Sequence, residues 1–189
     1  MGTKRVGLAR VQKLIENLKR DLDLSGTRLS GQIQGGNVLA RSATTAHDLS
    51  ATDKDLTVMY TGTQAGDITL PQATAANVGM VIKIIFGANA SGTAFKLGFL
   101  NSGSTVMAGT VSLCDFDSSA APDQTALVAS AKVINIDSNA ADAAGGAIGS
   151  HYTFTYLAAD TVHLSGVGVT TAGTPALDSN AESSGTGIS

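Results

Sequence analysis

HYTFTYLAADTVHLSGVGV (151–169) is the stretch with the clearest periodicity in the chain. Tyr152, Phe154 and Tyr156 alternate with Thr153, Thr155 and Leu157. Successive side chains of a β-strand point to opposite faces, so this alternation predicts a strand whose rings lie on the core side. The segment AFKLGF (94–99) repeats the pattern, with Phe95, Leu97 and Phe99 on one face.

Further segments of the same kind run from residue 56 to residue 169, each bounded by Gly, Asn, Ser, Pro or Asp. They are LTVMYT (56–61), DITLP (67–71), MVIKIIF (80–86), STVMAGTVSLCDF (104–116), TALVASAKVINID (125–137) and DTVHLSGVGV (160–169). About eight strands at such close spacing predict a mainly β fold. We expect an antiparallel β-sandwich, a jelly roll or a small barrel over residues 56–169.

The composition supports a turn-rich β protein with a thin core. Glycine is frequent, with 22 residues, while charged residues are 14% and aromatic residues only 4% of the chain. Small cores gain stability when copies bury surface against one another, so a homo-oligomer is expected. The single Cys114 excludes an internal disulfide and fits assembly in a reducing cytoplasm. No signal peptide or transmembrane stretch is predicted, and no membrane partner is expected.

The convincingly helical stretch is KRVGLARVQKLIENLKRDLDL (4–24), so residues 1–24 are predicted to form an amphipathic α-helix. Its apolar residues stand at steps of three and four, as in a coiled-coil seam: Leu8, Val11, Ile15, Leu18 and Leu22. The seam spans about two heptads, too few for a secure coiled coil, and so it needs a partner surface. Packing of the helix on its own β-domain is the alternative.

Two further segments have no strand or helix period. Residues 25–55 are rich in Gly, Ser and Thr and are expected to form an extended linker. Residues 170–189 are expected to form a flexible tail.

Charge is distributed unevenly along the chain. Residues 1–30 hold seven Lys or Arg and three Asp or Glu, a net charge of +4. The remainder holds five basic and twelve acidic residues, a net charge of −7. A basic arm on an acidic body indicates that the arm docks on something negative, or that the arm is simply a solvated surface.

Few residues are candidates for chemistry, and no catalytic, cofactor or metal site is predicted. His47, His151 and His163 lack the spacing of metal ligands, and His163 is expected to face solvent between two apolar neighbours. Asp115 and Asp117, with two following serines, could hold calcium, but a turn is the favoured interpretation. Nucleic-acid binding is not expected, because the basic helix has no aromatic residue for stacking and the body is acidic.

Three stretches resemble virion proteins of tailed phages. GDITLPQATAANVGMVIKIIF (66–86) is similar to an element of phage head and fibre proteins, in which a strand ends in Leu-Pro and a Gly opens the next apolar strand. The chain from STVMAGTVSLCDF to HYTFTYLAADTVHLSGVG resembles the later part of the same proteins. The opening KRVGLARVQKLIENLKRDL is similar to N-terminal segments of small proteins of marine tailed phages whose genes lie near the capsid gene.

The first of these stretches also has a physical interpretation. Pro71 has no N–H and should end a strand, and Gly79 should permit a tight return into the next one. The run VIKII alternates weakly, which predicts a strand covered on both faces. An ordinary connection between two strands explains the pattern equally well.

The resemblance implies a non-enzymatic, multimeric virion component, most simply a trimer. It favours a capsid decoration or cement protein over a fibre because the chain is short, and it places the protein on the capsid exterior after assembly in the host cytoplasm. The partner would be the major capsid protein. A head- or tail-fibre module that binds a host receptor or glycan is the alternative.

The N-terminal arm supplies the expected contact residues for the capsid or for oligomerisation. The polar contacts are expected from Lys4, Arg5, Arg10, Lys13, Lys19 and Arg20. The apolar anchor is expected from Leu8, Val11, Ile15, Leu18 and Leu22. Several such arms on one oligomer would strengthen attachment through effective concentration.

Overall fold

The structure is a computed structural model of the chain. It describes residues 38–51, 55–90, 95–100, 102–115, 123–126, 131–136, 145–170, 179–180 and 188. These residues belong to one compact unit, Gly36–Ser189. The predicted N-terminal helix and all of its proposed contact residues lie outside the described residues.

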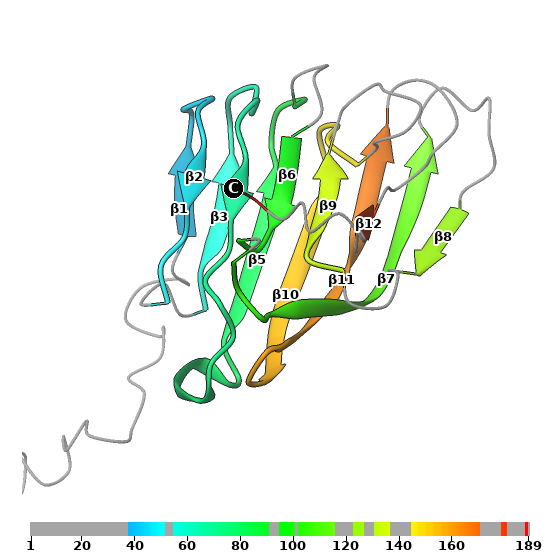
Figure 1. Ribbon diagram of the computed structural model, residues 1–189. Coiled ribbons are helices and arrows are strands. Elements are labelled where there is room, and N and C mark those ends of the chain that lie inside the picture. The colour runs from blue at the N-terminus through cyan, green and yellow to red at the C-terminus, as the bar shows by residue number, and fades with distance from the viewer. Residues whose placement is uncertain are drawn as a thin grey trace, which may run out of the picture. The chain divides into compact units, whose positions relative to one another are not determined.

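Two β-sheets form the two layers of the domain (Figure 1). The seven-stranded sheet has the order β1 (Val38–Arg41), β3 (Thr57–Tyr60), β5 (Val81–Phe86), β10 (His151–Ala158), β11 (Thr161–Thr170), β7 (Val106–Asp115) and β8 (Asp123–Ala126). The five-stranded sheet has the order β12 (Ser179–Asn180), β9 (Val133–Ile136), β6 (Phe95–Gly98), β4 (Ile68–Thr69) and β2 (His47–Asp48). One short 3-10 helix, Ala75–Asn77, precedes β5. The mainly β fold is therefore confirmed.

The strand directions correct the expectation of an antiparallel domain. β1, β3 and β5 are parallel neighbours in one sheet, and β2, β4 and β6 are parallel neighbours in the other. The chain thus alternates between the two sheets and advances one strand position per circuit, as a coil. Such a coil joins parallel strands without crossover helices, because the strand in the opposite sheet makes the return. Jelly-roll connectivity, which is antiparallel, is not confirmed.

The later strands complete both sheets. β10 pairs antiparallel with β5 and β11, and β11 pairs parallel with β7 over ten residues. β9 pairs antiparallel with β6. The domain is therefore a two-layer structure with mixed sheets.

Residues 38–48, predicted to be linker, are part of the first coil. The Thr61 N–H donates to the Arg41 carbonyl at 2.8 Å, and the His47 N–H donates to the Asp67 carbonyl at 2.9 Å. The coils stack so closely that a Cβ on Gly62 would lie 2.3 Å from the Ser42 carbonyl oxygen. The linker prediction is wrong here because these short strands are stabilised by the next coil, which no local pattern reveals.

Part of the predicted tail also belongs to the domain. Ser179–Asn180 form β12, which pairs with β9. Ile188 is only 6% exposed, and its N–H donates to the Phe99 carbonyl at 3.1 Å. The contacts that hold these residues come from strands far away in sequence, and for this reason the tail prediction is wrong at these positions.

The core lies between the sheets, and the alternation identified its main members. Tyr152, Phe154 and Tyr156 are buried, as are Phe95, Leu97 and Phe99. Rings from the two layers meet: the centroids of Phe86 and Phe95 are 6.2 Å apart, and those of Phe99 and Tyr156 are 6.4 Å apart. Aromatic pairs at such separations add to the free energy gained by burial.

The connection over residues 66–86 has the local features expected of it. Gly79 has φ of +83°, a conformation that glycine adopts without strain. The Tyr156 hydroxyl donates to the Pro71 carbonyl at 2.8 Å.

The predicted burial of VIKII on both faces is wrong, because Ile82, Ile84 and Phe86 are fully buried while Lys83 between them is exposed.

Candidate functional site

The outer face of the seven-stranded sheet, turned away from the core, is the candidate site. The register between strands places its side chains in three rows across the sheet. The first row is Val38, Thr57, Lys83, Thr153, Ser165 and Thr110. The second row is Ala40, Met59, Ile85, His151, Val167 and Ser112. The third row is Val81, Thr155, His163 and Ala108.

These sixteen positions, called the outer face below, are all exposed or half-buried. Lys83 is the one residue with a full charge among them, and no Asp or Glu is present. Seven are aliphatic residues or methionine, and six are Thr or Ser. The face is therefore nearly neutral on a domain whose sequence carries a net charge of −7 outside residues 1–30.

The other sheet offers no comparable surface among the described residues. Neighbouring residues on its strands are buried together, as are Ile68 and Thr69 on β4 and Val133 and Ile134 on β9. Since neighbours on a strand point to opposite faces, both faces of this sheet are covered at these positions. The outer face of the seven-stranded sheet is thus the broad sheet surface that reaches solvent.

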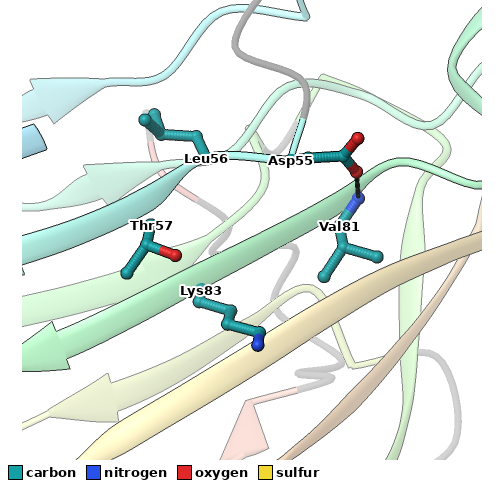
Figure 2. A pocket seen from close by; sticks show the side chains of 5 residues that line it. All are labelled: Asp55, Leu56, Thr57, Val81 and Lys83. Carbon is teal, nitrogen blue, oxygen red and sulfur yellow. Dashed lines mark hydrogen bonds between the residues drawn. The ribbon is translucent and has the colours of Figure 1, made fainter. Parts of the chain in front are cut away.

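A small hollow lies at one corner of the outer face (Figure 2). Asp55, Leu56, Thr57, Val81 and Lys83 line it, and its volume is about 220 Å³. A carboxylate oxygen of Asp55 accepts a hydrogen bond from the Val81 N–H at 3.3 Å, which fixes the turn before β3 (Figure 2). The hollow is smaller than the roughly 300–1,000 Å³ of typical ligand pockets, so it is better suited to a side chain than to a metabolite.

β1 is the first strand of the coil and forms one edge of the seven-stranded sheet. Leu39 pairs in register with the fully buried Val58 and so points toward the core, yet it is 42% exposed. Val38 on the other face is 62% exposed. The Arg41 guanidinium donates to the Ala46 carbonyl at 3.1 Å and closes the turn after this edge.

The histidines do not gather into one site. His163 and His151 lie exposed on the outer face, so the expectation that His163 faces solvent is confirmed. His47 is not in a linker but in β2, where Nδ1 lies 2.8 Å from the Tyr60 hydroxyl. Burial raises the pKa of Tyr60 well above its ordinary value, and the positive charge of Arg41 partly opposes this shift.

No cluster of metal-ligating side chains is found in the part of the chain that the structure describes. Cys114 is half-buried on β7. Asp117, half of the proposed calcium pair, lies outside the described residues. Among the residues that the structure describes, no helix has both the length and the hydropathy of a membrane-spanning segment.

The predicted arm and the outer face are different surfaces. The arm residues, from Lys4 to Leu22, are outside the described residues, and their proposed roles remain predictions. Sequence reasoning missed the outer face, although its signal was present in the positions that alternate with the core residues, such as Thr153 and Thr155 in β10. Only the strand order shows that such positions from six strands form one surface.

Comparison with models of protein families, with curated proteins and with solved structures found no match to this chain.

Proposed function

We propose that this protein is a non-enzymatic structural component of a tailed-phage virion that decorates or cements the capsid. Its β-domain would form a homo-oligomer, most simply a trimer, on the capsid exterior. Its N-terminal residues 1–24 would form an amphipathic helix that docks on the major capsid protein. The observation that carries the proposal is the nearly neutral outer face of an otherwise acidic domain.

The chemistry of this face favours protein contact over catalysis. The cores of protein interfaces are depleted of charged residues, as this face is. The hollow at its corner combines a single carboxylate with a single ammonium group and is lined otherwise by Leu56, Thr57 and Val81. A binding or structural role therefore accounts for the face better than an active site does.

The arm supplies the second half of the proposal. Residues 1–30 carry a net charge of +4, and the remaining chain is acidic, so the two parts are suited to different partners. The polar contacts would come from Lys4, Arg5, Arg10, Lys13, Lys19 and Arg20. The apolar contacts would come from Leu8, Val11, Ile15, Leu18 and Leu22.

A head- or tail-fibre module that binds a host glycan or receptor is the alternative. Glycan sites commonly use exposed aromatic rings that combine an apolar face with a polar edge. The three tyrosines, Tyr60, Tyr152 and Tyr156, are buried in the core. This burial favours decoration over glycan binding. Binding of the protein to a glycan array would instead favour the fibre module.

The test is co-sedimentation of the full-length protein with phage capsids that lack it. Ile15→Asp and Leu18→Asp place a charge in the apolar seam, and we expect each to abolish sedimentation with capsids while the circular dichroism of the β-domain is unchanged. Asn17→Asp adds the same charge outside the seam and should sediment like the wild type. Normal capsid binding by both seam variants would refute docking through the arm.

A further inference from the structure

We infer that the outer face of the seven-stranded sheet is the surface on which a second copy of this chain packs, sheet against sheet. The inference rests on the proposed function in that it names the surface of the self-association proposed there, but packing of one face on the same face of a second copy has two-fold symmetry and gives a dimer in place of a trimer. Its experiment is nevertheless independent of capsid binding.

Charge selects this face for self-association. Outside residues 1–30 each copy carries a net charge of −7, so two copies repel one another over most orientations. None of the sixteen positions carries a carboxylate, and Lys83 carries the one ammonium group, while the Asp55 carboxylate lines the hollow at the corner of the face. Two copies that meet through this face therefore bring fewer charges of the same sign close together than copies that meet in other orientations.

The face is also complementary to itself, as a two-fold interface requires. A hydroxyl group both donates and accepts hydrogen bonds, so Thr and Ser side chains pair with their own kind across an interface. Thr153, Thr155 and Ser165 lie near the middle of the sheet. A face built from carboxylates or ammonium groups alone would lack this property.

An apolar row crosses the same surface. Met59 on β3, Ile85 on β5 and Val167 on β11 lie in one row, with His151 between the last two. Met59 is 38% exposed, while Ile85 and Val167 are half-buried, so each has area left to bury. Sheets that pack face to face lie about 10 Å apart and interdigitate such side chains.

The size of the face corresponds to the lower end of interface sizes. Its sixteen positions compare with about 20–30 residues on each side of an interface of standard size. Lys83 lies opposite Thr153 near the middle of the face, and its long stem lets the ammonium group extend along the face toward the hollow that it lines. It lies beside the hollow at the corner of the face (Figure 2).

Other occupants fit this chemistry less well. A strongly basic partner would find a single carboxylate, that of Asp55 at the corner of the face, and a strongly acidic one would find a single lysine. A glycan would find no Tyr, Trp or Phe at any of the sixteen positions. A second copy is neutral at the same place and meets neither difficulty.

The experiment measures the solution mass of the full-length protein by light scattering after size exclusion. We expect the wild type to be a multimer. Thr153→Glu adds a carboxylate at the centre of the face, and because two copies would bring two such charges together, the mass should fall by about twofold. Val78→Glu is the matched control, since Val78 is 50% exposed in the turn before β5 and lies outside the face.

Ile85→Glu and Thr153→Lys are the supporting variants. Thr153→Lys places a second cation beside Lys83 and should also dissociate the multimer, so that dissociation does not depend on the sign of the added charge. Far-UV circular dichroism and the unfolding temperature identify any variant that fails to fold, and such a variant is replaced by the other two. A monomeric wild type, or a multimer that survives every folded face variant, would overturn the inference.

Capsid co-sedimentation of the same proteins separates this inference from the proposed function. A monomeric Thr153→Glu variant that still binds capsids, but with lower affinity than the wild type, supports both the inference and the proposed function. A wild-type multimer that Thr153→Glu dissociates, and that never binds capsids, supports the inference and refutes decoration. Glycan binding by the wild type that Thr153→Glu abolishes, without any change in mass, would assign the face to a glycan and overturn the inference.

Discussion

The imidazole Nδ1 of His47 lies 2.8 Å from the hydroxyl of Tyr60 and joins β2 of one sheet to β3 of the other. Their rings meet edge to face with centroids 5.9 Å apart. The contact lies in the first two coils, where the strands are only two to four residues long. It therefore ties together the part of the domain with the least strand pairing.

The first prediction concerns this contact. Tyr60→Phe removes the hydroxyl and should lower the free energy of unfolding by about 1 kcal/mol, the net value of a typical hydrogen bond. A double-mutant cycle with His47→Ala in chemical denaturation should show coupling between the two residues. His163→Ala, at an exposed position on β11, serves as the control and should change the stability by less than about 0.5 kcal/mol. Additive effects of the two core substitutions would argue against the contact.

The second prediction tests the stacking of the coils. Gly62→Ala would place a Cβ 2.3 Å from the Ser42 carbonyl oxygen, so the first coil must shift, and we expect a loss of about 2 kcal/mol or more. Gly79→Ala meets no atom within 4 Å and should cost only the strain of its positive φ, about 1–2 kcal/mol. Thermal and chemical unfolding of the two variants give the comparison. A milder effect at Gly62 than at Gly79 would contradict the close approach of the coils.

The third prediction tests the core assignment on β10. Phe154 is fully buried, and Phe154→Ala should cost about 3–5 kcal/mol because it removes a buried ring and leaves a cavity. Thr155→Ala, one residue further along the same strand but on the outer face, loses at most a hydroxyl contact and should cost about 1 kcal/mol or less. Equal effects at the two positions would mean that the strand does not separate a core face from an outer face.

The fourth prediction follows from the burial of all three tyrosines. Burial raises the pKa of Tyr60, Tyr152 and Tyr156 in the folded protein, while in the unfolded chain each keeps an ordinary value of about 10. Below that pH both states hold the protons and stability is unaffected. Above it the unfolded chain loses its protons first, so the stability contributed by the neutral tyrosines is lost as the pH rises.

The measurement is a spectrophotometric tyrosine titration beside circular dichroism. We expect the tyrosinate absorbance to appear only with loss of the folded signal, well above pH 10, and near pH 10 in denaturant. Ionisation of any tyrosine near pH 10 with the fold intact would show that its hydroxyl is not buried.

Alternation along the chain was enough to identify the core side of the longer strands. Tyr152, Phe154 and Tyr156 are buried as predicted, because the two-residue period of a strand is a local property that needs no knowledge of its neighbours. The same reasoning placed His163 in solvent, whereas the tight turn at Gly79 was predicted from the conformational freedom of glycine.

The tertiary structure decided which strands are neighbours and in which direction they run. An antiparallel hairpin and a parallel coil have the same alternating pattern, so nothing local distinguished them, and the coil from β1 to β6 was missed. Residues 38–41, 47–48 and 179–180 form strands only because distant segments pair with them. The outer face is decided in the same way, since Lys83, Thr153 and Ser165 become neighbours through register, which long-range hydrogen bonds set.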